Sequence, residues 1–385
     1  MKKILISYAT AGVGHKRAAL SIMEALEELS PGDAEISIID SLNYTNDFFR
    51  WTYLKGFVFL VNRLPTIWGM GYYLTDNFYI NAVLSKISQM SNWINSKKLR
   101  EYLVAAQPDV IISAHFYLSE VVADLKRKKL LRSQLITVVT DYILHAWWVA
   151  PETDIYVVGS EHARQDLLRW KTDPGKIKVL GIPVAPIFCK SLDKKSIKEK
   201  LGIRDGVMTM LVLGGGYGIG PIEGIVRAID SVQMPVQIIA VCGFNEKLAK
   251  KLELLRPHLK HEMKVLGFVY NIYEYMEVSD LLISKSGGIT TAESLFKDLP
   301  MLVVSPIIGQ ETRNCDFLTG EGAAMKINGL SALKGAIENI AAHPEVSDRM
   351  KQAIRNLRRP TASYDIAQMA LEMCGLQPKK APLCE

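Results

Sequence analysis

The fold is indicated most clearly by residues 281–293, which read LLISKSGGITTAE. The apolar run 281–284 predicts a buried strand, the small residues after it predict a tight turn, and Thr290 and Thr291 open a predicted helix. Short apolar runs alternate with helical patterns along the whole chain, which is typical of doubly wound α/β domains. The predicted strands are 3–8, 35–39, 109–113, 135–139, 154–158, 208–213, 236–241, 263–266, 281–284 and 301–304.

The chain has 385 residues, which is too many for one ordinary core and suits two domains. The lysine-rich segment 190–206 separates two sets of strands and predicts a short helix or hinge. We therefore expect an N-terminal domain over 1–190 and a C-terminal domain over 191–385. Segment 44–96 interrupts the alternation because it is rich in aromatic residues, poor in charge and without a strand pattern. It predicts one or more amphipathic helices, or a long excursion from the first domain.

The composition, 49% hydrophobic and 22% charged, is that of a soluble globular protein. The net charge of +6 favours anionic partners such as nucleotide phosphates or an acidic membrane surface. The five cysteines form no C-x-x-C pair, so neither a zinc site nor a disulfide framework is indicated, and a reducing cytosol is expected. No uncharged stretch reaches the roughly 18 residues that a membrane span needs. We expect the protein to touch a membrane without crossing it.

The turn after the first predicted strand, residues 11–19, reads AGVGHKRAA. Its glycines permit a tight turn, and the N–H groups of the following helix start suit an anion or a developing oxyanion. His15 stands at the carboxyl end of a strand, where its imidazole could accept a proton from an acceptor hydroxyl. The alternative is that His15 only caps the helix. Arg17 replaces the third glycine of the nicotinamide fingerprint, so that cofactor is not indicated.

A second glycine-rich turn, residues 213–221, reads LGGGYGIGP. It also fails the G-x-G-x-x-G count, and the chain contains no G-x-x-x-x-G-K-[ST] sequence, which excludes a P-loop NTPase. The turn either cradles a phosphate or is structural.

Two later turns bring polar groups to the ends of successive strands. In 284–293, backbone amides and hydroxyls could hold a pyrophosphate, and Glu293 could accept both hydroxyls of a ribose. The alternative is an ordinary capping arrangement. Residues 305–314 read SPIIGQETRN, and their amide and acid groups suit the vicinal hydroxyls of a hexose. Here the alternative is a polar helix start.

Taken in order, these motifs resemble glycosyltransferase family 28 over nearly the whole chain. The stretches GHKRAA at 14–19, TVVTD at 137–141 and GIPV at 181–184 are similar to its diacylglycerol branch, the monogalactosyldiacylglycerol synthases and the processive diacylglycerol glucosyltransferases. The sequence DYILHAWW at 141–148 is closer to the bacterial glucosyltransferases than to the plant enzymes. The resemblance implies a GT-B fold of class α/β, with two Rossmann-like doubly wound domains facing a cleft.

The resemblance also implies roles for individual residues. The acceptor-side base falls on His15, with Asp141 as a second catalytic candidate, the ribose carboxylate on Glu293, and the sugar-binding pair on Gln310 and Glu311. The remaining donor contacts are Gly214, Gly215, Gly216, Phe268, Val269, Ser286, Gly287, Gly288, Thr290 and Asn314. The acceptor or membrane contacts are Gly14, His145, Trp147, Phe57 and Phe59.

The implied reaction is a single displacement with inversion at the sugar, without a metal or other cofactor. No D-x-D motif is present, and His258 and His261 are interpreted as solvated residues on a helix end. The expected partners are a UDP-hexose (glucose or galactose), diacylglycerol or a glycosyl-diacylglycerol, and an anionic membrane surface, with no nucleic acid. The expected location is cytoplasmic and peripheral, on the inner face of the cell membrane.

Three other functions remain compatible with the motifs. One is a UDP-GlcNAc-dependent transferase that acts on a polyprenyl-linked peptidoglycan precursor. Another is a UDP-sugar epimerase or hydrolase of the same fold. The third is a non-catalytic UDP-sugar-binding module, which His15 and Asp141 argue against because such a module needs no acceptor-side base.

Overall fold

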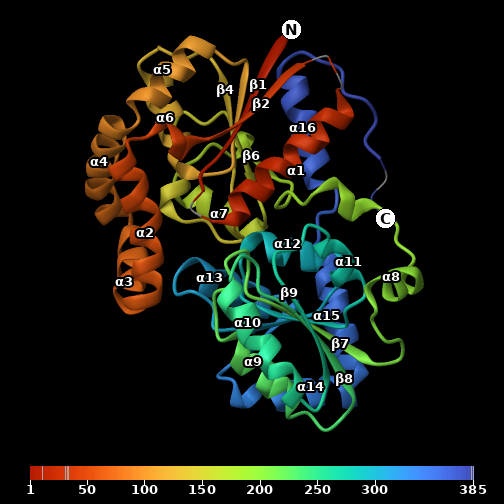
Figure 1. The fold of residues 1–385 in the computed structure, drawn as a ribbon. Coiled ribbons are helices and arrows are strands. Elements are labelled where there is room, and N and C mark those ends of the chain that lie inside the picture. Colours follow the sequence, from red (N-terminus) through yellow and green to blue (C-terminus); the bar gives the residue numbers. More distant parts are fainter. Residues whose placement is uncertain (11, 31, 33, 383, 385) are drawn as a thin grey trace. The chain divides into compact units, whose positions relative to one another are not determined.

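The computed structural model describes residues 1–385 except 11, 31, 33, 383 and 385, and leaves the side chains of 54, 57, 58 and 62 undescribed (Figure 1). It divides into two compact units. Unit 1 comprises Met1–Pro186, Ile308–Gln310 and Arg359–Cys384, and unit 2 comprises Ile187–Ile307 and Glu311–Arg358. The division falls close to the expected boundary at 190. Residues 359–384, which the sequence-based division assigned to the second domain, cluster with unit 1.

Unit 1 is built on a parallel six-stranded sheet in the order β2-β1-β3-β4-β5-β6. The strands are β1 (Lys2–Tyr8), β2 (Ala34–Asp40), β3 (Val110–Ser113), β4 (Gln134–Val138), β5 (Ile155–Val158) and β6 (Ile177–Val179). The central strand β3 is buried along its whole length, as expected where helices cover both faces of a sheet. The order reverses between β1 and β3, and doubly wound sheets bind ligands at the carboxyl side of such a point.

The helices of unit 1 connect the strands and cover the sheet (Figure 1). They are α1 (Val13–Leu29), α2 (Asp47–Arg63), α3 (Pro65–Thr75), α4 (Phe78–Asn95), α5 (Lys97–Ala106), α6 (Phe116–Arg127), α7 (Glu161–Arg169) and α16 (Ala362–Met373), with 3-10 turns η1 (Ser41–Tyr44), η2 (Ala146–Trp148) and η3 (Pro174–Lys176). Helix α16 packs against α1, and the Tyr364 hydroxyl donates to a Glu28 carboxylate oxygen over 2.6 Å. The last helix of the chain therefore completes the fold of the first unit.

Segment 44–96 is helical, as the sequence suggested, and forms α2, α3 and α4. Each helix has an ordinary start: Asn46 and Asn77 cap α2 and α4 through their side-chain oxygens, and Pro65 opens α3. None of the residues of α4 is buried, although the helix is largely apolar. None of the helices in the described part of the chain is long and apolar enough to span a membrane.

Unit 2 repeats the architecture with a parallel sheet in the order β12-β11-β10-β7-β8-β9. Its strands are β7 (Met208–Leu213), β8 (Val236–Val241), β9 (Glu262–Leu266), β10 (Leu281–Ser284), β11 (Met301–Val304) and β12 (Ala324–Ile327). Its helices are α8 (Lys194–Leu201), α9 (Ile222–Asp230), α10 (Glu246–Leu255), α11 (Ile272–Glu277), α12 (Gly288–Phe296), α13 (Gln310–Gly320), α14 (Ser331–Ala342) and α15 (Pro344–Leu357), with the 3-10 turn η5 (Arg256–His258). A last 3-10 turn, η4 (Pro186–Cys189), lies where the two units divide.

One prediction from the sequence needs correction. His261 is buried, and its Nε2 lies 3.0 Å from the carbonyl oxygen of Val232, whereas His258 is exposed as expected. Spacing along the chain gave no sign of this burial, since it depends on tertiary placement.

Candidate active site

In unit 1, the predicted base His15 lies in the first turn of α1, above the carboxyl ends of the central strands. The turn that precedes α1 is held by Asp40 at the end of β2, which accepts a hydrogen bond from the backbone N–H of Thr10 over 3.3 Å. Gly12 is the N-cap and makes no side-chain cap. Gly14 and His15 are both half-buried. The helix start therefore keeps free N–H groups beside the imidazole.

The hydrogen bonds of His15 decide which of its ring nitrogens carries the proton. Nδ1 lies 2.9 Å from the carbonyl oxygen of Ala114, after β3, and 3.1 Å from Oγ1 of Thr140, after β4. A carbonyl oxygen can only accept, so Nδ1 carries the proton and Nε2 presents a lone pair. Burial lowers the pKa of His15 to about 4, against the opposing effect of the Ala114 carbonyl. His15 is thus a neutral imidazole at pH 7, with one nitrogen available as a proton acceptor.

A second histidine, which the sequence reasoning missed, lies directly against His15. The ring of His115 is buried, and its centroid lies 4.6 Å from that of His15 in an edge-to-face arrangement. Its Nδ1 accepts a hydrogen bond from the backbone N–H of Tyr117 and caps α6. Burial, and then the nearby His15, hold the pKa of His115 well below its ordinary value. Like His15, His115 lies at a helix start that follows a strand, and this signal could have identified it.

The loop after β4 carries the other predicted residues of unit 1. Asp141 is half-buried and directly follows Thr140, the residue that contacts His15. His145 is buried, and both of its ring nitrogens are engaged: Nδ1 accepts from the backbone N–H of Trp147 over 3.2 Å, and Nε2 lies 2.9 Å from the carbonyl oxygen of Tyr72. His145 therefore fastens this loop to α3 and positions the half-buried Trp147. Asp141 is therefore adjacent in sequence to a residue that contacts the predicted base.

In unit 2, the predicted donor residues gather at the carboxyl ends of β7 to β11. Gly214, Gly215 and Gly216 begin a turn that packs backbone to backbone against the turn after β8. A Cβ at Gly218 would lie 2.3 Å from the carbonyl oxygen of Cys242, and one at Gly243 would lie 2.2 Å from that of Gly216. Close approach and positive φ thus explain these two glycines without a ligand.

The turn between β10 and α12 has the form expected of an anion site. Gly287 is the N-cap without a side-chain cap, Gly288 begins the helix, and Thr290 is half-buried in its first turn. Glu293 is 2% exposed, one turn further along the same helix. The free N–H groups of a nine-residue helix therefore point out of the turn beside a buried carboxylate.

Residues of α13 tie this turn to the next one. Asn314 Nδ2 donates to the carbonyl oxygen of Ser286 over 3.1 Å, and Ser286 Oγ donates to the carbonyl oxygen of Glu311 over 2.6 Å. Glu311 itself is held by Lys285, whose Nζ lies 3.2 Å from its Oε1. Gln310, the first residue of α13, is half-buried. Sequence reasoning assigned no role to Lys285.

Aromatic rings from three consecutive loops form a cluster at the same sheet edge, and all but the half-buried Phe268 are exposed. Phe244 and the predicted base-reading residue Phe268 stack with ring centroids 4.3 Å apart and planes 9° from parallel. Tyr217 lies 6.4 Å from Phe244, and Tyr270 lies 5.1 Å from Phe268. Val269, between Phe268 and Tyr270, is half-buried. No group of three or more His, Cys, Asp or Glu side chains among the described residues is arranged to hold a metal.

Comparison with known families supports the interpretation of both units. Residues 15–184 match the monogalactosyldiacylglycerol (MGDG) synthase family, and residues 209–366 match the glycosyltransferase family 28 C-terminal domain. The chain belongs to glycosyltransferase family 28. The first match begins at His15, and the second spans every strand-end turn of unit 2 described above. The family 28 chain is therefore an enzyme that transfers a sugar.

Curated relatives cover the family 28 chain almost completely. A Bacillus subtilis (strain 168) protein named processive diacylglycerol beta-glucosyltransferase is 28% identical over 375 residues, 96% of this chain and 95% of the relative. A Bacillus pumilus (strain SAFR-032) protein of the same name is 28% identical over 379 residues, 97% and 96% of the two chains. Each alignment covers both units, so the same relatives support the interpretation of unit 1 and of unit 2.

Solved structures confirm the fold. The chain is similar to a Staphylococcus aureus MnaA–UDP complex, with a TM-score of 0.64 at 17% identity over 99% of this chain and 100% of that one. It is also similar to Acinetobacter baumannii MurG, with a TM-score of 0.61 at 13% identity over 97% and 100%. Two six-stranded parallel sheets in one chain agree with these neighbours, and the prediction of a GT-B fold of class α/β is confirmed.

Proposed function

We propose that this family 28 enzyme transfers a hexose, glucose or galactose, from a UDP-hexose to the hydroxyl of diacylglycerol or of a glycosyl-diacylglycerol, with inversion at the sugar. The observation that carries the proposal is the neutral His15, whose Nδ1–H is fixed by the Ala114 carbonyl while Nε2 can accept a proton. The names of the curated relatives support diacylglycerol as the acceptor.

In the proposed step, Nε2 of His15 takes the proton of the acceptor hydroxyl, and the oxygen of that hydroxyl forms a bond to the sugar C1. The bond from C1 to the UDP oxygen breaks, and both electrons of that bond leave with UDP. The free N–H groups at the start of α12 stabilise the negative charge of the leaving diphosphate. Because a base with a low pKa holds a proton weakly, Asp141 is proposed to stabilise the imidazolium that forms.

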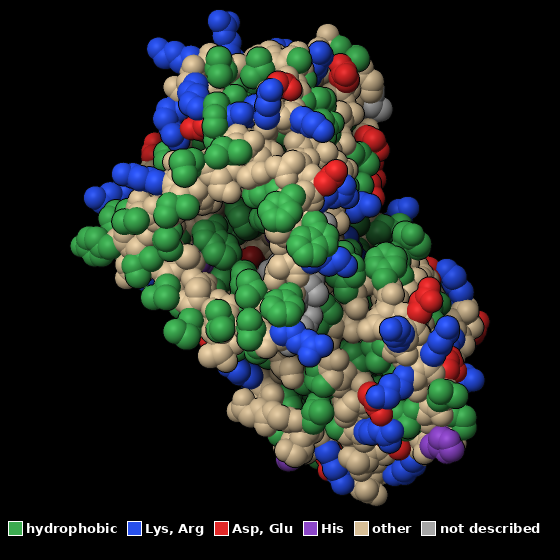
Figure 2. Space-filling model, turned by 60° about the vertical axis from the view of Figure 1, so that its left-hand side comes forward, with side chains coloured by type: hydrophobic (Ala, Val, Ile, Leu, Met, Phe, Trp, Pro, Cys, Tyr) green, Lys and Arg blue, Asp and Glu red, His purple; other side chains and the backbone are tan. Residues whose placement is uncertain are grey.

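The surface of α2 to α4 is proposed to bring the enzyme to its insoluble acceptor. Figure 2 shows hydrophobic side chains gathered on the face that carries these helices. The exposed large apolar residues of this α2–α4 surface are Phe48, Trp51, Phe59, Leu64, Ile67, Met70, Tyr73, Leu74, Phe78, Tyr79, Ile80, Val83, Leu84, Ile87, Met90 and Ile94. Apolar patches of this extent on a soluble protein mark interaction sites, and a bilayer suits one that carries little charge.

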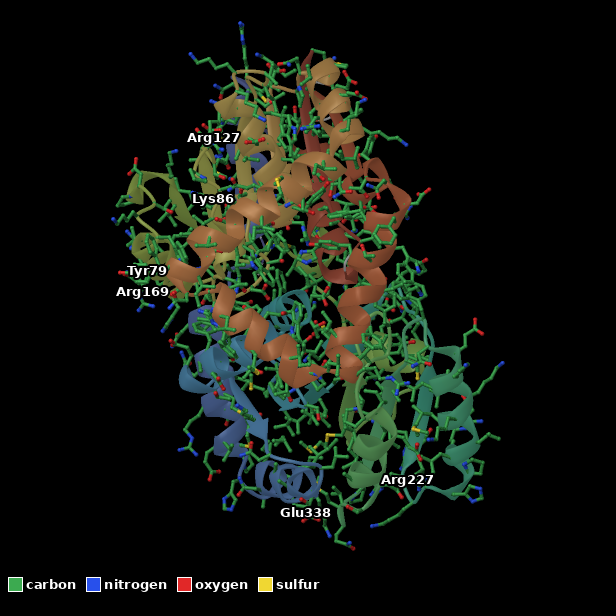
Figure 3. All side chains as sticks on the ribbon, turned by 90° about the vertical axis from the view of Figure 1, so that its left-hand side faces the viewer. Tyr79, Lys86, Arg127, Arg169, Arg227 and Glu338 are labelled. Carbon is green, nitrogen blue, oxygen red and sulfur yellow. The ribbon has the colours of Figure 1, made fainter. Side chains whose placement is uncertain are left out.

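The charges around the α2–α4 surface agree with an anionic bilayer. Lys86 is the only charged residue of α4. Figure 3 shows Tyr79 and Lys86 on this helix, with Arg169 of α7 near Tyr79, and the Phe78 ring lies 5.3 Å from Trp170, which follows Arg169. Phe59 is 56% exposed, whereas the side chain of Phe57 lies outside the described residues. The apolar α2–α4 surface and the basic residues near it together support the proposed location, which is peripheral and on the inner face of the cell membrane.

A transfer assay with the purified full chain tests the proposal. The protein is incubated with radiolabelled UDP-glucose or UDP-galactose and with vesicles that contain diacylglycerol, and the lipids are resolved and the anomeric configuration is read by NMR. Labelled glycolipid of inverted configuration is expected, with no loss of turnover when a chelator is added. His258→Ala, which removes an exposed histidine of unit 2, is the control for His15→Ala. Label on a polyprenyl-linked acceptor instead, or free sugar alone, would contradict the proposed acceptor.

A further inference from the structure

The ion pair between Lys285 and Glu311 lies beside the phosphate-binding end of α12 and has no role in the step described above. Both side chains are largely enclosed, with 14% of Lys285 and 10% of Glu311 exposed, and Nζ lies 3.2 Å from Oε1. A Cβ built on Gly287, the N-cap of α12, would lie 3.7 Å from the same Oε1. The carboxylate of Glu311 therefore lies next to the positive end of this helix.

Two different anions, a diphosphate and the Glu311 carboxylate, could occupy this position. The helix start and the ammonium of Lys285 together suit a diphosphate, which carries more negative charge than one carboxylate. In the structure, Glu311 supplies the negative charge there. Thr291, in the first turn of the same helix, is 1% exposed and its Oγ1 makes no hydrogen bond to the described residues. A diphosphate bound at this helix end would therefore compete with Glu311 for the ammonium of Lys285.

We infer that Lys285 and Glu311 form an exchangeable pair: the donor diphosphate takes Lys285 from Glu311, and the released carboxylate accepts hydroxyls of the donor sugar. The inference rests on the proposed function, since it needs a nucleoside diphosphate sugar as the donor. Lys285 becomes a binding residue for the leaving group, and Glu311 couples arrival of the diphosphate to recognition of the sugar.

The backbone around Glu311 allows this exchange without loss of the fold. Its Oε2 accepts a hydrogen bond from the backbone N–H of Ile307 over 2.8 Å, and its carbonyl oxygen accepts from Ser286 Oγ. Neither bond uses Oε1 or Lys285. Releasing Lys285 therefore leaves the turn after β11 attached to the turn after β10, and only the partner of one oxygen changes.

Competition predicts effects of opposite sign for the two members of the pair. Lys285→Met removes a cation from the diphosphate and should weaken UDP binding roughly tenfold or more, with a smaller loss for UMP. Lys285→Arg should retain most of the affinity. Glu311→Gln removes the competing charge but keeps an acceptor for Ile307, so UDP should bind several-fold to roughly tenfold more tightly. The same substitution should lower the preference for UDP-glucose over UDP, because Gln accepts sugar hydroxyls less strongly.

The experiment is calorimetric titration of the full chain and its variants with UMP, UDP and UDP-glucose, with thermal unfolding as a check on the fold. Glu277→Gln is the matched control, because Glu277 pairs with the enclosed Lys297 over 2.8 Å at the other end of α12. It should leave UDP affinity unchanged. In a Lys285→Met background, the gain from Glu311→Gln should shrink, since the contested cation is absent.

The outcomes separate the inference from the proposed function. Tighter UDP binding by Glu311→Gln together with weaker binding by Lys285→Met supports the exchange. Weaker or unchanged UDP binding by a folded Glu311→Gln protein overturns the exchange and leaves the proposed function standing. If the unaltered chain binds no UDP at all, both the proposed function and the inference fail.

Discussion

Glu120 of α6 offers a test of how the α2–α4 surface is attached to unit 1. Its Oε2 accepts a hydrogen bond from Nδ2 of Asn92 on α4 over 2.7 Å. The two groups border a small cavity between the helices, lined by Gln89, Asn92, Trp93, Ser96, Glu120, Val121 and Asp124. Burial, and to a smaller extent Asp124, raise the pKa of the Glu120 carboxyl from its ordinary value of 4.5 to about 7, against the effects of Asn92 and Arg127.

The raised pKa predicts how stability changes with pH. The unfolded chain releases this proton near pH 4.5, and the folded chain keeps it until about pH 7. In that window the folded state binds more protons, so the free energy of unfolding falls as the pH rises. One pKa unit corresponds to about 1.4 kcal/mol, so the ionised carboxylate should cost on the order of 3 kcal/mol at pH 8.

Glu120→Gln removes the ionisation and keeps an acceptor for Asn92. The variant should match the wild type near pH 4 and become more stable by up to about 3 kcal/mol at pH 8. His15 and His115, whose pKa values are lowered, make stability rise with pH in an overlapping range. Both histidines are present in both proteins, so their effect cancels in the difference.

Urea unfolding from pH 4.5 to 8.5 measures this difference, and hydrogen exchange of the α4 peptides assigns it to the helix. Asp205→Asn, which alters an exposed carboxylate paired with Lys198 in unit 2, is a control that should not change α4 exchange. A stability difference that stays constant across the pH range would refute the reasoning, because the Glu120 carboxyl would then have an ordinary pKa.

Three further predictions concern the site and the membrane. His15→Ala should lower turnover by roughly 10²–10⁴-fold, with UDP affinity nearly unchanged by calorimetry, and normal turnover would reassign the base to Asp141. In the wild type, the acid limb of the profile of turnover against pH should lie near pH 4 and not near 6.5, because the base is neutral above its pKa. Glu293→Ala should weaken UDP binding by about 1.5–3 kcal/mol, the loss of a charged hydrogen-bond acceptor, and unchanged affinity would remove Glu293 from the site. Ile87 and Met90 are both exposed on α4. The double variant Ile87→Ser and Met90→Ser should sediment less with anionic vesicles and turn over less lipid, while it still binds UDP. An equal loss of UDP binding would count against a docking role.

Most of the sheet framework could be predicted from the sequence. Each of the ten predicted strands coincides with a strand of the structure to within one residue at either end. The two missed strands, β6 (Ile177–Val179) and β12 (Ala324–Ile327), lie at sheet edges and carry a lysine among only three or four residues. Edge strands are half-covered, so their sequences lack the continuous apolar run that reveals a central strand.

The site could be predicted in its residue types and chain positions, but only in part in its contacts. His15 and Glu311 lie at the helix starts where the motifs placed them, and Glu293 lies one turn into its helix, as expected. Their immediate neighbours, Thr140 and Lys285 among them, come from other strand ends, and no spacing in the sequence relates them. Which residues from different strand ends come into contact depends on the order of the strands in the sheet, and the spacing of residues along the chain does not reveal this order.

The remaining contacts escape sequence reasoning for a more general reason, because the atoms that orient the candidate residues belong to the main chain. The proton of His15 is fixed by the carbonyl oxygen of Ala114, and His145 is held by that of Tyr72. Oε2 of Glu311 is held by the N–H of Ile307. Any residue at those three positions would present the same carbonyl or, unless it were proline, the same N–H. Side-chain identity therefore shows which groups are available for catalysis, while the backbone path shows which of their atoms remain available to react.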